Sequence, residues 1–127
     1  MTELPTGTVT FVFTDIEGST RLLGTLGDRY RQALEQHRTI LRDAFTSHGG
    51  VEVDTQGDAF FVAFSTPREA LQAAIRGQHA LAEHPRPQGG ELPARMGIHT
   101  GTPEVTEEGY VGSDVHLGAR ICAAAFT

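Results

Sequence analysis

Two aspartates stand where β-rich segments end or turn, and carboxylates in such places can bind metal ions. Residues 8–14 alternate β-branched and aromatic side chains, which predicts a buried strand that ends at Asp15. Asp58 lies at the tip of a predicted hairpin, and Gly18 and Gly57 would let the backbone approach a ligand. Two carboxylates that meet at one sheet edge would suit hard divalent cations, and paired cations catalyse phosphoryl transfer. The two positions alone favour a plainer interpretation, in which Asp15 caps a turn and Asp58 is a turn residue.

A second chemical feature is the segment Gly18, Ser19 and Thr20, which precedes the apolar pair Leu22-Leu23. Backbone amides that converge at the start of a short helix there would form an anion-binding site. The pattern alone favours a simpler alternative, in which a Ser or Thr side chain caps the helix.

A third feature is the pair His116 and Arg120, four residues apart on a predicted helix and therefore on one face. The planar donor fork of arginine suits phosphate oxygens. A solvated helix face is the more ordinary explanation of such a pair. The spacing of the other histidines is not typical of metal ligands.

The elements that must position these residues follow from periodicity and turn signals. A helix is predicted from an N-cap at Asp28 to Gly49-Gly50, and segments 51–55 and 58–64 predict a hairpin. A capping box at residues 66–69 begins a second helix. Its expected buried face consists of Ala70, Leu71, Ala74, Ile75, Gln78 and Leu81. A loop (84–93), a strand (94–101), a short loop (107–109) and a helix from Ser113 are predicted to follow.

This order of elements predicts an α/β sandwich with helices packed on one sheet. The chain stops inside or just after its last predicted helix. A domain of this kind is expected to continue with at least one more strand, so we expect a sheet that is truncated at the C-terminus.

The composition is that of a small acidic globular protein. Its 127 residues carry a net charge of −6, and 39% are hydrophobic, enough for one core. The lack of a basic stripe argues against nucleic acid as a partner. No apolar run approaches the roughly 20 residues that cross a bilayer, and the N-terminus does not resemble a signal peptide, so we expect a cytoplasmic protein without a membrane partner. Cys122, the only cysteine, is expected to be a small buried residue.

Four segments carry a resemblance: TVTFVFTDIEGST, VDTQGDAFFVAF, ARMGIHTG and YVGSDVHLGARI. Their order and spacing resemble the catalytic domain of class III adenylyl and guanylyl cyclases, especially of actinobacterial members. The resemblance covers essentially the whole chain, so residues 1–127 are expected to form one cyclase homology domain. It implies a ferredoxin-like α+β sandwich and a head-to-tail homodimer with both active sites at its interface. In such enzymes the ribose 3′-hydroxyl of a nucleoside triphosphate attacks the α-phosphate, and pyrophosphate leaves.

The resemblance also implies a role for each matching residue. Asp15 and Asp58 would hold two magnesium or manganese ions, with the backbone carbonyl of Ile16 as a further ligand. Arg120 falls on the arginine that stabilises charge at the α-phosphate. The β- and γ-phosphates would be cradled by residues 17–20, which are Glu17, Gly18, Ser19 and Thr20.

Three positions depart from the family pattern. Asp54 replaces the base-reading lysine of adenylyl cyclases and is chemically nearer to the glutamate of guanylyl cyclases. Its partner position is Gly109, which has no side chain, and the transition-state asparagine is replaced by His116. A phosphate-binding lysine that follows the last helix in the family falls beyond the end of this chain.

Two functions therefore stay open. The first is an enzyme that converts ATP, or GTP, to its 3′,5′-cyclic monophosphate. This enzyme would be slow, because the loss of one correctly placed hydrogen-bond donor lowers a catalytic rate by about 10²–10³. The second is a catalytically silent cyclase homology domain that serves dimerisation, nucleotide binding or signalling. The intact metal and arginine positions favour the first function, and the three altered positions favour the second.

Overall fold

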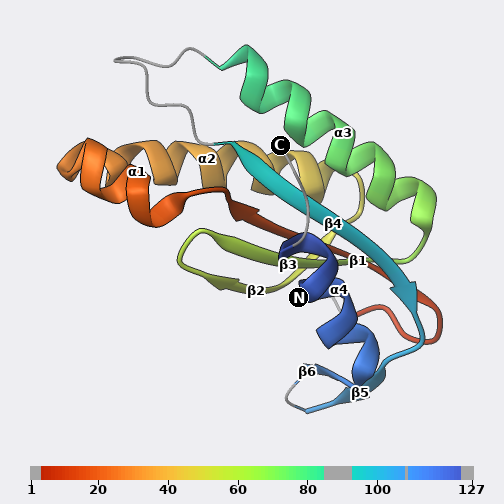
Figure 1. The fold of residues 1–127 in the computed structure, drawn as a ribbon. Coiled ribbons are helices and arrows are strands. Elements are labelled where there is room, and N and C mark those ends of the chain that lie inside the picture. The colour runs from red at the N-terminus through yellow and green to blue at the C-terminus, as the bar shows by residue number, and fades with distance from the viewer. Residues whose placement is uncertain (1–3, 85–92, 108, 124–127) are drawn as a thin grey trace.

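A computed structural model of the chain describes residues 4–84, 93–107 and 109–123 (Figure 1). The elements, in chain order, are β1 (Val9–Ile16), α1 (Ser19–Leu26), α2 (Asp28–Ser47), β2 (Val51–Gln56), β3 (Ala59–Phe64), α3 (Pro67–Glu83), β4 (Ala94–Gly101), β5 (Glu104–Thr106), β6 (Gly109–Val111) and α4 (Ser113–Ala123). Within the described residues, no helix combines the length and apolar character that crossing a bilayer requires.

The main sheet has four strands in the order β2-β3-β1-β4, and every neighbouring pair is antiparallel. Sequence order β1, α2, β2, β3, α3, β4 with this strand order is the ferredoxin-like arrangement, so the predicted fold class is confirmed. β1 lies in the interior of the sheet between β3 and β4. The end of β1 therefore meets the β2–β3 turn on one side and the start of β4 on the other.

Alternation along the strands divides the core into two layers. α2 and α3 cover one face of the sheet, where Val12 of β1 packs with Phe60 of β3 and Leu41 of α2. α4 lies across the other face, where Phe11 and Phe13 of β1 pack with buried Cys122. Figure 1 shows the two layers, with α2 and α3 together on one side of the strands and α4 on the other.

Most predicted elements are confirmed within a residue or two. The capping box at the start of α3 is present, since Thr66 Oγ1 accepts a hydrogen bond from the Glu69 amide (3.2 Å) and donates one to its carboxylate (3.0 Å). Three details are wrong. Gly27, not Asp28, is the N-cap of α2. Leu71, Ile75 and Gln78 of the predicted buried face are exposed, because α3 turns its small residues to the sheet.

The third difference is a small two-stranded sheet, because the short strands β5 and β6, which were not predicted, flank the loop predicted at 107–109. Its strands are only three residues each, too short to give a clear alternation. Most of the predicted loop at 84–93 lies outside the described residues. The assignment of residues 1–127 to a single domain stays a prediction.

Candidate functional site

The carboxylate of Asp58 lies at the end of β1. Gln56 and Ala59 are paired across β2 and β3, so Gly57 and Asp58 form a two-residue turn. Gly57 takes a φ of 56°, which glycine adopts at little cost. Asp58 Oδ2 then accepts a hydrogen bond from the Ile16 amide at 2.8 Å. The turn is also held from α2, where an Arg38 Nη2 group donates to the Gly57 carbonyl.

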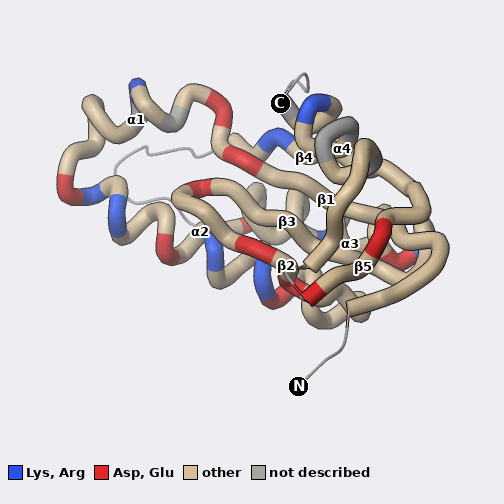
Figure 2. Tube along the Cα trace, turned by 90° about the horizontal axis from the view of Figure 1, so that it is seen from below, with Lys and Arg blue, Asp and Glu red and all other residues tan. Residues whose placement is uncertain are grey.

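Asp15 immediately precedes Ile16, and its side chain lies on the face covered by α4. Both of its oxygens accept hydrogen bonds from Arg95, with Nε–Oδ1 at 2.7 Å and Nη2–Oδ2 at 2.6 Å. This pairing raises the pKa of the Arg95 guanidinium. Asp15 and Arg95 are direct partners in the β1–β4 register, so the sheet places them opposite each other. Figure 2 shows acidic residues at this end of β1 and on the β2–β3 hairpin.

The two carboxylates offer a set of hard oxygen donors. Among the described residues, no group of three or more His, Cys, Asp or Glu side chains could hold a metal ion. Magnesium, however, is commonly bound by one or two carboxylates together with substrate phosphates, and keeps water for the rest. The oxygens of Asp15 and Asp58 are therefore of the kind that magnesium or manganese takes when it arrives with a nucleotide, and the Ile16 carbonyl stays a predicted ligand.

Next to the carboxylates, helix α1 begins at Gly18. This residue is the N-cap with φ 68° and ψ 30°, and no side chain caps the helix. The alternative of a Ser or Thr side-chain cap is therefore wrong, since only glycine tolerates this left-handed conformation easily. The side chain of Glu17 is half-buried and that of Thr20 is exposed, whereas the side chain of Ser19 is not among those that the structure describes. The uncapped helix start leaves backbone amides for an anion.

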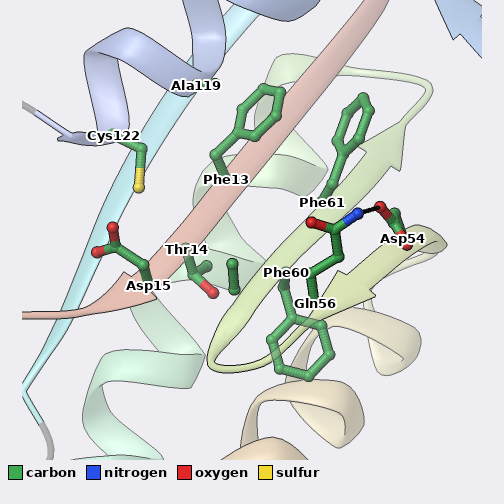
Figure 3. A pocket seen from close by; sticks show the side chains of 10 residues that line it. Phe13, Thr14, Asp15, Asp54, Gln56, Phe60, Phe61, Ala119 and Cys122 are labelled. Carbon is green, nitrogen blue, oxygen red and sulfur yellow. Dashed lines mark hydrogen bonds between the residues drawn. The ribbon is translucent and has the colours of Figure 1, made fainter. Parts of the chain in front are cut away.

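A pocket of about 250 Å³ lies on the α4 face of the sheet (Figure 3). Phe13 and Phe61 stack in its wall, with ring centroids 4.4 Å apart, while Asp15 and Asp54 lie on opposite sides of it. Asp54 is held by its own strand. Its oxygens accept hydrogen bonds from the Thr55 amide at 2.9 Å and from Gln56 Nε2 at 3.0 Å.

Two neighbouring groups have shifted pKa values. Burial raises the pKa of the Cys122 thiol to about 11, and the charge of nearby Asp15 adds to this effect. Burial also raises the pKa of Tyr30, with a further contribution from the charge of Asp58. Tyr30 is half-buried in the first turn of α2, so the charge of Asp58 acts on the start of this helix.

Among the described side chains, the remaining predicted residues lie away from this cluster. Gly109 begins β6, with a φ of 108°. Arg120 is exposed on α4, and its side chain makes no hydrogen bond or ion pair with any other described residue. The backbone of His116 lies on the same helix, but its side chain is outside the described part.

Sequence reasoning missed three residues that shape the site: Arg95, Gln56 and Arg38. Arg95 stands in a recognised strand, but its partner is revealed only by the register of β1 with β4. Gln56 could have been found, because it shares a strand face with Asp54. Nothing in the sequence pairs Arg38 of α2 with the hairpin turn.

Residues 1–113 match the family described as the adenylate and guanylate cyclase catalytic domain. The chain belongs to this family. Three of the four segments that carry the resemblance lie within the matched residues, and the fourth, at 110–121, begins within them.

Individual relatives agree with this assignment. An adenylate cyclase of Lachancea kluyveri is 38% identical over 146 residues, which cover 95% of this chain and 8% of the relative. An uncharacterised protein of Mycobacterium tuberculosis strain H37Rv is 32% identical over 119 residues, which cover 92% of this chain and 39% of the relative. This cyclase domain therefore spans well under half the length of either relative.

Among solved structures, the chain is similar to an adenylate cyclase of Trypanosoma brucei in its monomeric state. The TM-score is 0.88 at 26% identity, over 98% of this chain and 72% of that one. The fold of this chain is therefore that of a solved adenylate cyclase domain.

Proposed function

We propose that this cyclase domain converts ATP or GTP to the 3′,5′-cyclic monophosphate and pyrophosphate. The observation that carries the proposal is the hydrogen bond from the Ile16 amide to Asp58. It brings the second carboxylate to the strand end that bears Asp15, where both can serve one triphosphate. The matched family, which includes both adenylate and guanylate cyclases, supports the reaction class but leaves the base open.

In this proposal Asp15, Asp58 and the Ile16 carbonyl hold two magnesium or manganese ions. When bound, such ions stabilise negative charge on the phosphates and make the attacking hydroxyl more acidic. Residues 17–20 bind the β- and γ-phosphates through the free amides at the start of α1. The protein residues hold the triphosphate so that the ribose 3′-hydroxyl is aligned for attack on the α-phosphate, opposite the leaving pyrophosphate.

The transition-state residues come from a second copy of the chain in a head-to-tail homodimer. Arg120 of that copy stabilises charge on the α-phosphate, and His116 donates to the ribose ring oxygen. The exposed position of Arg120 supports this role. The elements around it carry exposed apolar side chains suited to an interface, namely Val105, Val111 and Ile121.

The nucleotide base is read by Asp54, with Gly109 at the partner position. The carboxylate of Asp54 offers acceptors for guanine N1–H and N2–H, while adenine requires a donor at N1. The apolar wall formed by Phe13 and Phe61 next to Asp54 suits a flat aromatic ring.

The direct test is an assay of purified protein with manganese and either ATP or GTP, with the product identified by mass spectrometry. Cyclic nucleotide is expected, and Asp58→Ala should abolish it. Asp43→Ala, which removes a carboxylate from the exposed side of α2, is the matched control and should leave the rate unchanged. Product that persists in Asp58→Ala would come from a contaminating enzyme and would contradict the proposal.

A second candidate is a catalytically silent domain that binds nucleotide or metal and serves dimerisation or signalling. It is favoured by Asp54, both of whose oxygens are already bonded to its own strand, and by the missing side chain at Gly109. Binding of manganese or nucleotide without product at micromolar protein would support this candidate over the enzyme.

A further inference from the structure

Arg95 occupies both oxygens of one of the two carboxylates. Its Nε and Nη2 groups face Asp15 Oδ1 and Oδ2 at 2.7 and 2.6 Å, a two-pronged contact that is the strongest geometry for this pair of groups. The two side chains are 24% and 26% exposed, so water screens their attraction less than it screens a fully exposed pair.

The fold holds Arg95 in this position. Asp15 and Arg95 are cross-strand neighbours, and Cys122 Sγ donates to the Arg95 carbonyl at 3.6 Å. A β-carbon placed on Gly97, two residues further along the same face of β4, would lie 2.5 Å from the Cys122 amide nitrogen, so α4 presses directly on this strand. The backbone of Arg95 therefore has little freedom, and only its side chain can leave Asp15.

The two carboxylates are consequently unequal. Asp58 gives one oxygen to the Ile16 amide, and within the described residues its Oδ1 accepts no hydrogen bond. Asp15 gives both oxygens to a permanently charged cation. A divalent ion that approaches Asp15 meets the positive charge of Arg95 and must share or displace it.

We propose that Arg95 is a built-in counter-cation that competes with the divalent ion for Asp15, so that metal affinity depends on the release of this arginine. The inference rests on the proposed function, because it takes Asp15 and Asp58 as the metal site. It adds a positioning residue that tunes metal binding. Without metal Arg95 keeps the carboxylates from repelling each other, and with metal it swings away.

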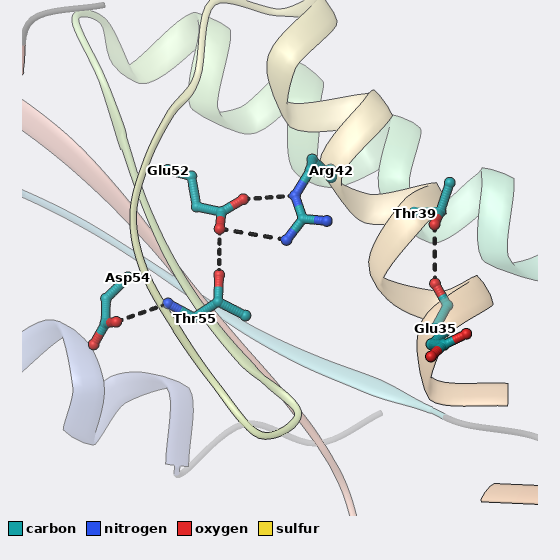
Figure 4. Close-up of polar contacts among 6 residues, drawn as sticks. All are labelled: Glu35, Thr39, Arg42, Glu52, Asp54 and Thr55. Atoms are coloured by element: carbon teal, nitrogen blue, oxygen red, sulfur yellow. Dashed lines mark hydrogen bonds and ion pairs between the residues drawn. The ribbon is translucent and has the colours of Figure 1, made fainter. Parts of the chain in front are cut away.

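The chain provides a matched control. Arg42 of α2 forms a similar fork with Glu52 of β2, at 2.7 Å and 3.4 Å, on the opposite face of the sheet (Figure 4). Arg42→Gln breaks an arginine–carboxylate pair of the same kind away from the proposed metal site.

The experiment measures manganese affinity without nucleotide, from the electron paramagnetic resonance signal of free Mn²⁺. Arg95→Gln is expected to lower the Kd for manganese about tenfold, the effect of removing one nearby charge in a water-screened site. Arg95→Lys should give a smaller decrease, since lysine keeps the charge but loses the fork. Arg42→Gln should leave the Kd unchanged.

The outcomes separate this inference from the proposed function. Asp58→Asn should weaken manganese binding, and if it does not, the metal site itself is wrong. If Asp58→Asn weakens binding but Arg95→Gln leaves the Kd unchanged or raises it, the metal site stands and Arg95 does not compete. Circular dichroism checks folding, and if Arg95→Gln fails to fold, an unchanged or higher Kd in Arg95→Lys overturns the inference.

Discussion

The carboxylate end of the sheet and the α4 region are built in different ways. At the carboxylate end, Asp15, Asp58 and Arg95 are held by contacts within one chain, over distances of 2.6 to 2.8 Å. In the α4 region, Arg120 is exposed and touches none of these groups, and Gly109 lies on a separate small sheet. The carboxylates of the proposed site are thus held within one chain, while Arg120 of the other half is exposed. This division is what a reaction shared between two chains requires.

The two regions also differ in the interactions that hold them. The β2–β3 turn is held by hydrogen bonds from Ile16 and Arg38. α4 is held by close packing, since a β-carbon on Gly118 would lie 2.3 Å from Phe13 Cε2. Polar contacts can adjust when a ligand arrives, whereas close packing fixes α4 on the sheet. We therefore expect the carboxylate end to respond to metal and the α4 region to remain rigid.

The strongest test of the division is complementation between two inactive variants. Asp58→Asn and Arg120→Ala should each lower product formation by about 100-fold or more. An equal mixture should recover about a quarter of the wild-type rate, because half of the dimers are mixed and each of those has one intact site. Cyclic nucleotide formation measures the recovery. A mixture of Asp58→Asn with Asp15→Asn, which both damage the carboxylate end, should recover nothing; equal recovery in the two mixtures would disprove the shared site.

Close packing of α4 is tested by Gly118→Ala, which should lower the free energy of unfolding by about 1–3 kcal/mol through overpacking against Phe13. Urea denaturation monitored by circular dichroism measures the change. Gly24→Ala in α1 is the control, because a β-carbon there meets no atom within 4 Å, and it should stabilise by about 0.5–1 kcal/mol. A neutral or stabilising Gly118→Ala would show that α4 is not tightly seated.

Recognition of the nucleotide base would use Asp54 together with Gly109 of the small sheet. Asp54→Lys tests this recognition. Lysine supplies a donor for adenine N1 in place of acceptors for guanine, so the ratio of ATP to GTP turnover should rise about tenfold. The measurement is kcat/KM for each nucleotide. Asp43→Lys makes the same charge change on the exposed side of α2 and should not alter the ratio. An unaltered ratio in Asp54→Lys would place Asp54 away from the base.

A last prediction concerns β6, where the Tyr110 hydroxyl donates to the Pro5 carbonyl at 2.6 Å. Burial raises the pKa of Tyr110 from 10.0 to about 12, so the folded chain keeps a proton that the unfolded chain has lost. Stability from this group is complete below pH 10 and is lost as the pH rises towards 12. Thermal unfolding across this range should show a steeper alkaline decline for the wild type than for Tyr110→Phe, and parallel curves would contradict the assignment.

Periodicity and capping in the sequence were sufficient for most of the fold. The alternation in residues 8–14 predicted β1, and the capping box at Thr66 predicted the start of α3. The apolar pattern failed at Leu71 and Ile75, because α3 approaches the sheet through small residues that a hydrophobicity pattern ranks below leucine and isoleucine. The sequence pattern did not predict the β5–β6 hairpin, because strands of three residues are too short to show alternation of apolar and polar side chains.

The candidate site was predictable residue by residue but not as an arrangement. The family resemblance identified Asp15 and Asp58, yet it did not show that Asp58 is bonded to the Ile16 amide. It also gave no hint that Asp15 faces Arg95, which is 80 residues away in the chain.

The sequence by itself determined the elements, the family and the identity of the candidate ligands, because propensity, alternation and motif spacing are local properties of the chain. Tertiary structure alone decided which charges meet. The register of β1 with β4 placed Arg95 on Asp15, and the turn after β2 placed Asp58 on Ile16. Such pairings depend on strand order and register, which arise only when the whole sheet closes its core.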